Sequence, residues 1–392
     1  MNISDSNQAG SAPGGVLLVA PTPPPYGGMA LQARLLAKLL EEDGIAVDLL
    51  GHTQPLPAPL RFLDRLPILR TLLRAVVFYW RFWFKARHAE VVHILAASWL
   101  NFLLVVGPAV VMGRLQRKRI ILNYRGGDAD GFLKYFAWLA KPIFRMANFI
   151  TAPSGFLAAV IERRTGVSVS IVPNIINFSI FRHRERLEFQ PKMLVTRHLE
   201  EIYGVETVLM AYRHILREYP AASLWIAGTG SLEGRLRALV STWGLSNVRF
   251  LGYLEHKALS SIYDECDILL NASQVDNFPG SLLEASASGL AIVSTNAGGI
   301  PFLYENGTNA LLVEVGDWQA LASETMRAIR NPALTRRLAS ASLELCRRCE
   351  WSSVRRTLYR VYGFQFDQEN RETSLVNRSV VWPARPYRAA EE

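Results

Sequence analysis

The sequence predicts an α/β protein of two Rossmann-like parallel-sheet domains that face each other across a cleft. Its 392 residues exceed the usual size of one domain. Half of the residues are hydrophobic and 20% are charged, a composition typical of a globular chain with a large core. Short apolar runs alternate with helical segments, the order expected of β-α-β units.

The first domain is expected over residues 15–181. An apolar run at 15–20 predicts a buried strand, and an amphipathic segment at 29–44 predicts a helix that ends at a glycine. Further buried strands are predicted at 45–50, 90–96, 119–124 and 148–154.

Residues 182–192 are charged and lack a periodic pattern, which predicts a linker. The strand and helix alternation restarts in a second domain over 193–365. Its last helix either stays with this domain or packs back on the first one. Strands are predicted at 193–199, 224–228, 248–254, 267–273, 291–295 and 310–315, and a helix at 205–219. Residues 1–14 are expected to be a disordered tail, and residues 366–392 a second tail.

The net charge of +9 is unevenly placed. Between residues 61 and 120, eleven Arg and Lys residues face two acids, and eleven minus two equals the net charge of the chain. Residues 60–87 interleave basic with aromatic and aliphatic residues, a pattern that predicts docking on an anionic membrane surface. The alternative is a core helix whose basic side faces water. No nucleic-acid-binding motif accompanies the charge, so a nucleic-acid partner is not expected.

Residues 91–112 carry no full charge and are long enough to span a bilayer. They also contain Ser98, Asn101 and Pro108, which favour a buried strand at 90–95, a turn, and a helix at 100–116. The first 15 residues lack a basic start and an apolar core, so no signal peptide is predicted. We therefore expect a cytoplasmic protein, peripheral at the inner face of the cell membrane.

Cys346 and Cys349 form a C-x-x-C pair on a predicted helix, without a second pair or a Cys/His cluster. We interpret them as two thiols in a reducing compartment and not as a metal or redox site.

The most informative stretch is 275–301, which follows a predicted strand and opens a helix. A helix N-terminus with exposed amides binds anions and polar ligand oxygens. Asp276 and Glu284 are eight positions apart, so they can hold different parts of one extended ligand. The residues expected to bind it are Asp276, Asn277, Phe278, Pro279, Gly280, Ser281, Leu282 and Glu284.

This stretch resembles the C-terminal domain of the family 4 retaining glycosyltransferases (glycosyl transferases group 1), which have the GT-B fold. Their Glu-x7-Glu motif is met here as Asp276-x7-Glu284, and a glycine pair follows at 298–299. Asp replaces the first Glu, and Ala291 stands where proline is usual. The resemblance implies that Asp276 is catalytic and, with the amides after it, holds the donor sugar, while Glu284 binds the ribose hydroxyls.

A second match lies at 196–212, where the family has an Arg and a Lys-Gly that neutralise the donor pyrophosphate. Arg197 and Gly204 fit, but Tyr203 replaces the Lys, which is similar to a subgroup with an Asn-Leu-Glu-Pro-Ile-Tyr-like phosphate loop. Arg125, at the end of a predicted strand where the family often has a His, is the expected substitute cation and a second catalytic candidate.

In the first domain, Gly27 and Gly28 match the glycine pair that the family places near the donor sugar. Asp128-Ala129-Asp130 spells the D-x-D metal motif of the other large glycosyltransferase fold, but the surrounding motifs do not suit that fold. No metal and no other cofactor is therefore expected.

The resemblance implies a retaining glycosyltransferase, in which the first domain (15–181) binds the acceptor and the second (193–365) binds the nucleotide-sugar. It would transfer a hexose from a nucleotide-diphosphate sugar to a membrane-associated, lipid-linked glycan acceptor in bacterial polysaccharide or glycolipid synthesis. The family is held to react on one face of the sugar, with the leaving phosphate oxygen assisting deprotonation of the acceptor. Two alternatives stay open: a non-catalytic, degenerate nucleotide-binding subunit of the same fold, and a sugar-nucleotide epimerase.

Overall fold

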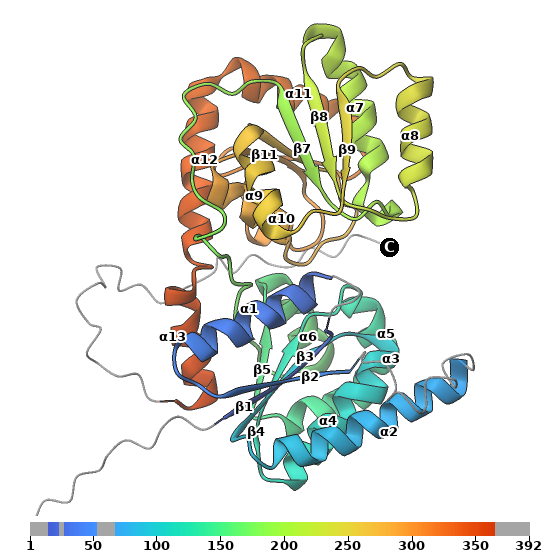
Figure 1. The fold of residues 1–392 in the computed structure, drawn as a ribbon, viewed down its shortest axis with the longest axis vertical. Helices are drawn as coiled ribbons and strands as arrows, with labels where there is room; N and C mark the ends of the chain where they lie inside the picture. Colours follow the sequence, from blue (N-terminus) through green and yellow to red (C-terminus); the bar gives the residue numbers. More distant parts are fainter. Residues whose placement is uncertain (1–14, 23–26, 53–66, 365–392) are drawn as a thin grey trace, which may run out of the picture. The chain divides into compact units, whose positions relative to one another are not determined.

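A computed structural model describes residues 15–22, 27–52 and 67–364 (Figure 1). The predicted tails at 1–14 and 366–392 lie outside the described residues, as do 24–26 beside the first glycine pair and the start of the basic segment. The chain divides into two compact units. Among the described residues, the first unit comprises 15–152, 160–170 and 357–364, and the second comprises 153–159 and 171–356.

The first unit is built on a six-stranded sheet in the order β2-β1-β3-β4-β5-β6. Strand β1 pairs in parallel with β2 on one side and β3 on the other, with Val16 opposite Val47 and Val91. All residues of β1 and β3 are buried, as predicted for strands covered on both faces. The strands are β1 (Val16–Ala20), β2 (Val47–Gly51), β3 (Val91–Ala96), β4 (Arg119–Tyr124), β5 (Phe149–Ala152) and β6 (Ser170–Ile171).

The stretch at 91–112 is not one long helix. After β3 it forms a short helix, a π-helical turn and a further helix, and no helix in the described part of the chain is long and apolar enough to cross a membrane. The helices that begin in this half are α1 (Gly28–Glu42), α2 (Pro67–Ala86), α3 (Trp99–Asn101), the π-helix η2 (Phe102–Val106), α4 (Gly107–Leu115), α5 (Ala129–Met146) and α6 (Gly155–Thr165).

The second unit repeats the architecture with a parallel sheet in the order β12-β11-β10-β7-β8-β9. Together the two parallel six-stranded sheets confirm the predicted α/β fold. The strands are β7 (Lys192–Thr196), β8 (Ser223–Ala227), β9 (Val248–Gly252), β10 (Ile268–Asn271), β11 (Ala291–Thr295) and β12 (Leu311–Val313).

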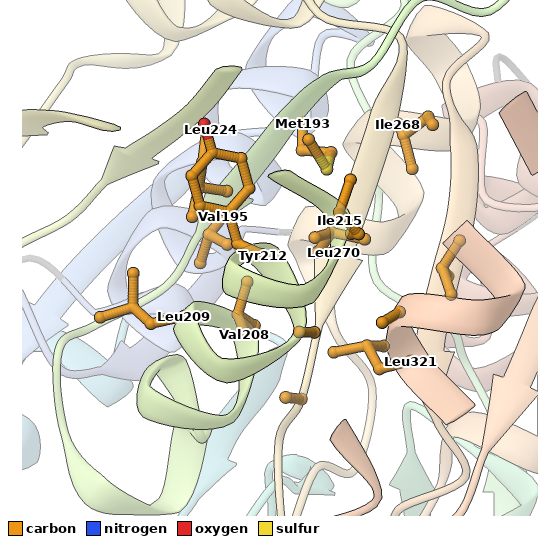
Figure 2. Packing of buried hydrophobic residues seen from close by; sticks show 14 of the residues in the cluster. Met193, Val195, Val208, Leu209, Tyr212, Ile215, Leu224, Ile268, Leu270 and Leu321 are labelled. Carbon is orange, nitrogen blue, oxygen red and sulfur yellow. The ribbon is translucent and has the colours of Figure 1, made fainter. Parts of the chain in front are cut away.

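Helix α7 packs its apolar face on this sheet. Figure 2 shows Val208, Tyr212 and Ile215 of α7 beside residues of β7, β8 and β10, and all three are buried. The Tyr212 hydroxyl contacts the carbonyls of Ala222 (2.9 Å) and Ser246 (2.8 Å), so this core tyrosine has polar partners. The helices after β7 are η3 (Glu201–Tyr203), α7 (Val205–Glu218), α8 (Glu233–Thr242), α9 (His256–Glu265), α10 (Gly280–Ser288), η4 (Ile300–Phe302), α11 (Trp318–Arg330), α12 (Pro332–Arg347) and α13 (Trp351–Tyr362).

The charged segment 182–192 contains no helix before β7 begins, yet it is anchored to the second unit. Arg186 is buried and donates to Asp267 (2.9 Å) and to the carbonyls of Ser288 (2.6 Å) and Tyr263 (2.8 Å). Satisfying a buried guanidinium in this way ties the segment to β10 and α10.

The end of α13 belongs to the first unit. Tyr362 shares a 2.6 Å hydrogen bond with His93 of β3, and the Tyr359 hydroxyl donates to Asp43 at 2.6 Å. Arg119 donates to the Val361 carbonyl at 2.9 Å. These contacts fix the last helical turns against β3 and β4.

Both sheets have a point where the strand order reverses. In the first, β1 lies between β2 and β3; in the second, β7 lies between β8 and β10. In open α/β sheets, ligands bind beyond the carboxyl ends of the strands at such a switch point. The loops after β7 and β10, and those after β1 and β3, are therefore the first places to search for function.

Candidate functional site

Arg197 directly follows β7 and is held on three sides. Its Nε donates to Asn271 Oδ1 at 2.9 Å, and its Nη2 forms an ion pair of 2.7 Å with Asp276 Oδ2. The guanidinium lies over the ring of Tyr203, 5.4 Å from its centroid. The side chains of Arg197 and Asp276 are each only 11% exposed, so the pair is well shielded from water. The structure thus brings together two residues that the sequence placed in separate motifs.

Gly204 lets the turn after Tyr203 approach the neighbouring strand. Its φ of +60° lies in the left-handed region, and a Cβ atom at this position would lie 2.1 Å from the carbonyl oxygen of Ala272. The Gln274 amide donates to the Ile202 carbonyl at 2.8 Å across the same contact. Glycine at this position of the motif is therefore required by packing inside the protein.

The loop from Asp276 to Pro279 leads into α10. Asp276 Oδ1 accepts from the amide of Phe278 at 3.2 Å, and the Asp276 carbonyl accepts from the Gly299 amide at 2.6 Å. A Cβ on Gly299 would lie 2.1 Å from the carbonyl oxygen of Asn277. The second glycine of the pair at 298–299 thus fixes the loop that carries Asp276.

Helix α10 begins at Gly280, with Pro279 as its N-cap. The amides of Gly280, Ser281 and Leu282 occupy the first turn, where no carbonyl of the same helix is available to accept them. The Ser281 hydroxyl is buried and has no hydrogen-bond partner among the described residues. These groups suit the oxygens of a polar or anionic ligand.

Glu284 lies one turn further along α10 in a buried hydrogen-bond network. Its Oε2 accepts from the Tyr263 hydroxyl at 3.0 Å, and Tyr263 shares a 2.9 Å hydrogen bond with Thr196 of β7. His256 Nε2 lies 3.8 Å from Glu284 Oε1. Burial raises the pKa of Glu284, and the neighbouring His256, Tyr263 and Arg197 only partly offset this. Ligand hydroxyl groups that donate to this largely buried carboxyl would stabilise its charged form.

The remaining predicted residues, Gly27, Gly28 and Arg125, belong to the first unit. Gly27 is the N-cap of α1 and Gly28 its first residue, and a Cβ on either would meet no atom within 4 Å. Arg125 follows β4, where its amide donates to the Ala96 carbonyl at 2.8 Å. Burial lowers the pKa of Arg125 to about 10, which leaves it charged near neutral pH.

The carboxylates of the D-x-D stretch have protein partners. Asp128 caps α5 by accepting from the Gly131 amide, and Asp130 pairs with Arg163 at 2.7 Å and Arg164 at 2.8 Å. Within the described ranges, no cluster of three or more His, Cys, Asp and Glu residues is arranged to hold a metal ion.

Cys346 and Cys349 are buried in the core of the second unit. Cys346 Sγ donates to the Leu283 carbonyl at 3.3 Å, and burial raises the pKa of Cys349 to about 12. Burial also raises the pKa of Cys346 well above its usual value. Both thiols therefore stay protonated, which favours the structural interpretation of the pair.

The sequence did not single out several residues that shape this site. Asn271 orients Arg197, and Tyr263, Thr196 and His256 surround Glu284. Of these residues, Asn271 was the one that the sequence could have indicated, because a polar residue at the carboxyl end of an apolar strand is typical of a ligand-facing position. Tyr263 and His256 lie on a helix distant in sequence, and no spacing signal connects them to Glu284.

Comparisons with known proteins indicate which family the chain resembles. Residues 26–179 match the model of Glycosyltransferase Family 4, and residues 178–344 match the model of Glycosyl transferases group 1. Both models describe glycosyltransferases, and together they match residues 26–344. The match to a particular phosphate-loop subgroup stays a prediction.

Among curated relatives, the chain is 28% identical to the amylovoran biosynthesis glycosyltransferase of Erwinia amylovora, over 44% of this chain and 43% of the relative. It is also 28% identical to the phosphatidyl-myo-inositol mannosyltransferase of Mycobacterium leprae, over 49% of this chain and 52% of the relative. These matches span about half the length of the curated relatives.

The fold extends further than the sequence similarity. The Anabaena protein HepE, solved in complex with UDP, superposes with a TM-score of 0.70 at 17% identity, covering 89% of this chain and 99% of HepE. The glycosyltransferase domains therefore adopt the GT-B fold.

Proposed function

We propose that the protein is a retaining glycosyltransferase that moves a hexose from a nucleotide-diphosphate sugar to a lipid-linked glycan acceptor. Donor binding is supported by one observation: the Arg197–Asp276 ion pair and the first turn of α10 lie at the switch point of the second sheet. A single cation beside a helix N-terminus suits a diphosphate. The neighbour HepE, solved with UDP, supports a nucleotide ligand.

In this proposal Arg197 and the α10 amides hold the diphosphate and stabilise its charge as it leaves. Glu284 accepts from the ribose hydroxyls, and Asp276 holds the sugar. The bond between the anomeric carbon and the phosphate oxygen breaks, and a bond to the acceptor oxygen forms on the same face. The acceptor proton passes to the departing phosphate oxygen. Arg125 is kept as the candidate second cation, and the proposal requires no metal.

The acceptor half rests on the outer face of α2. Four apolar residues of α2 form an exposed row, spaced four positions apart and 45% to 64% exposed: Leu72, Val76, Trp80 and Phe84. Phe78 and Phe82 are buried on the opposite side. The alternative of a core helix with a basic outer side therefore does not describe α2, because apolar residues occupy its exposed row.

Basic residues flank this apolar row. The Arg87 guanidinium lies over the rings of Phe84 (4.9 Å) and Trp83 (5.8 Å), and Arg81 is half-buried beside the row. Lys85 also lies beside the row but is paired with Asp48. Aromatic residues that enter a headgroup region, with cations beside them, suit an anionic membrane. The phosphatidyl-myo-inositol mannosyltransferase among the relatives supports a lipid acceptor. We propose a peripheral protein of the inner membrane face.

Transfer with known donors tests the proposal. The protein is incubated with UDP-, GDP- or ADP-hexoses and lipid extract, and the product's anomeric configuration is read by NMR. The expected result is one active nucleotide series and a product with the donor's configuration. An inverted product would contradict the mechanism. Nucleotide binding without turnover would favour the degenerate subunit, and isomerisation of the donor without acceptor would favour the epimerase.

A further inference from the structure

Trp99 stands at the switch point of the first sheet, a position that the donor site leaves unused. It follows β3, which neighbours β1 where the strand order reverses. In the second sheet the equivalent loop, after β10, carries Asp276. The same rule for open α/β sheets therefore places a ligand next to Trp99.

The backbone of Trp99 adopts a conformation that packing alone does not explain. Its φ is +58°, in the left-handed region that bulky residues rarely enter. Such outliers persist only where the surroundings hold them, and they cluster at ligand sites. Yet Trp99 remains 41% exposed, so the strained conformation does not serve to bury the side chain.

The indole ring is nevertheless fixed in place. Its Nε1 donates to Asp128 Oδ2 at 3.2 Å, and its ring meets Phe132 and Phe136 edge-on at centroid distances of 5.7 and 5.9 Å. The loop below is equally constrained, because Ser98 Oγ shares a 2.8 Å hydrogen bond with the Tyr124 hydroxyl. An ordered, partly exposed aromatic ring with a carboxylate at its edge is thus presented at the carboxyl end of the sheet.

We propose that Trp99 and Asp128 form the platform that binds a pyranose ring of the acceptor. The apolar C–H face of the sugar packs on the indole, and Asp128, whose side chain is exposed, accepts from the ring hydroxyls. The inference rests on the proposed transferase function. Arg197, Glu284 and the amides of α10, which are proposed to hold the nucleotide, lie in the second unit, and we assign the sugar at Trp99 to the acceptor. It also gives Asp128 a role other than binding metal.

Octyl hexosides below their micelle concentration test the platform, since they join one pyranose to an alkyl chain. Saturation-transfer NMR on the whole protein reports binding without turnover. We expect transfer to the sugar-ring protons in wild type, near-complete loss in Trp99→Ala and retention in Trp99→Phe. Trp138→Ala, which removes another exposed tryptophan of the same unit, is the matched control and should bind like wild type. Unchanged ring signals in Trp99→Ala, or signals from the alkyl chain alone, overturn the proposal.

Kinetics separates this inference from the function on which it rests. With an active donor, Trp99→Ala should raise the KM for the octyl hexoside at least ~10-fold, while the donor KM and the nucleotide-induced rise in Tm stay at wild-type values. An unchanged acceptor KM overturns the platform and leaves the transferase proposal intact. If wild type transfers neither to the octyl hexoside nor to the lipid extract, the function fails, and the NMR result alone decides whether Trp99 binds a sugar.

Discussion

Arg197 and Asp276 form a shielded ion pair, 2.7 Å long, between the ends of β7 and β10. Arg197, the residue proposed to hold the phosphates, and Asp276, the residue proposed to hold the sugar, thus neutralise each other. A diphosphate that binds Arg197 competes with Asp276, whose carboxylate is then released to hydroxyl groups of the sugar. The pair therefore links the two halves of donor binding.

Asp276→Ala should separate these two roles. Transfer is expected to fall by about 100-fold or more, because the proposed contact to the reacting sugar is lost. Affinity for the free nucleoside diphosphate should rise, since Arg197 loses its competitor and the diphosphate loses a nearby like charge. Transfer assays and calorimetric titration measure the two effects. Glu265→Ala, at an exposed acid on α9, is the control; near-normal turnover of Asp276→Ala would remove Asp276 from the mechanism.

Glu284→Gln should leave the free protein at least as stable as wild type at neutral pH. Burial raises the pKa of Glu284, so between the ordinary and the raised pKa the native state binds more protons than the unfolded state. Its contribution to stability therefore falls as the pH rises through that window. Without ligand, the Gln variant should have a Tm at or above that of wild type at pH 7, and the difference should shrink as the pH is lowered. A Tm difference that grows on acidification would refute this account.

Gly204→Ala should destabilise the phosphate loop. The added Cβ would lie 2.1 Å from the Ala272 carbonyl at a positive φ, so we expect a loss of about 1–3 kcal/mol of unfolding free energy and weaker nucleotide binding. Gly234→Ala is the matched control, because a Cβ there meets no atom within 4 Å and the position is helical. It should be neutral or stabilising by about 0.5–1 kcal/mol. Denaturant unfolding compares the two; equal stabilities would contradict the packing argument.

The exposed row of α2 predicts membrane binding. Wild type should float with vesicles containing phosphatidylglycerol. The Trp80→Ser/Phe84→Ser double variant should have an affinity for these vesicles at least about 10-fold lower, because two large apolar side chains no longer enter the bilayer. Leu187→Ser, at an exposed leucine of the second unit, is the control and should bind like wild type. High salt should weaken the interaction, since the basic flank contributes to it. Equal flotation of the double variant and wild type would remove α2 from the interface.

The strand pattern was predictable because parallel strands covered on both faces are continuous apolar runs. The runs at 15–20 and 119–124 correspond to β1 and β4. Strand β6 was missed, because its two residues, Ser170 and Ile171, carry no periodic signal. The anchoring of Arg186 was missed as well, since a charged segment in sequence gives no indication of which carbonyls surround it after folding.

The candidate site was only partly predictable for a similar reason. Sequence motifs singled out Asp276 and Glu284 as one spaced pair and Arg197 as part of a second, separate stretch. Their relationships depend on which strands are neighbours, and β7 and β10 are neighbours only in the folded sheet. The proposed role of Trp99 could not be predicted from the sequence, because it rests on a backbone angle and on the Asp128 carboxylate that holds the ring.

The most direct test of the central claim is a thermal-shift panel of UDP, GDP, ADP and their hexose conjugates, with wild type, Glu284→Ala and the control Glu265→Ala. A ligand at one hundred times its Kd stabilises a protein by about 2.7 kcal/mol. We predict a rise in Tm with one nucleotide series, lost in Glu284→Ala and kept in Glu265→Ala. No shift with any nucleotide, or an equal shift in Glu284→Ala, would contradict a donor site at β7, β10 and α10.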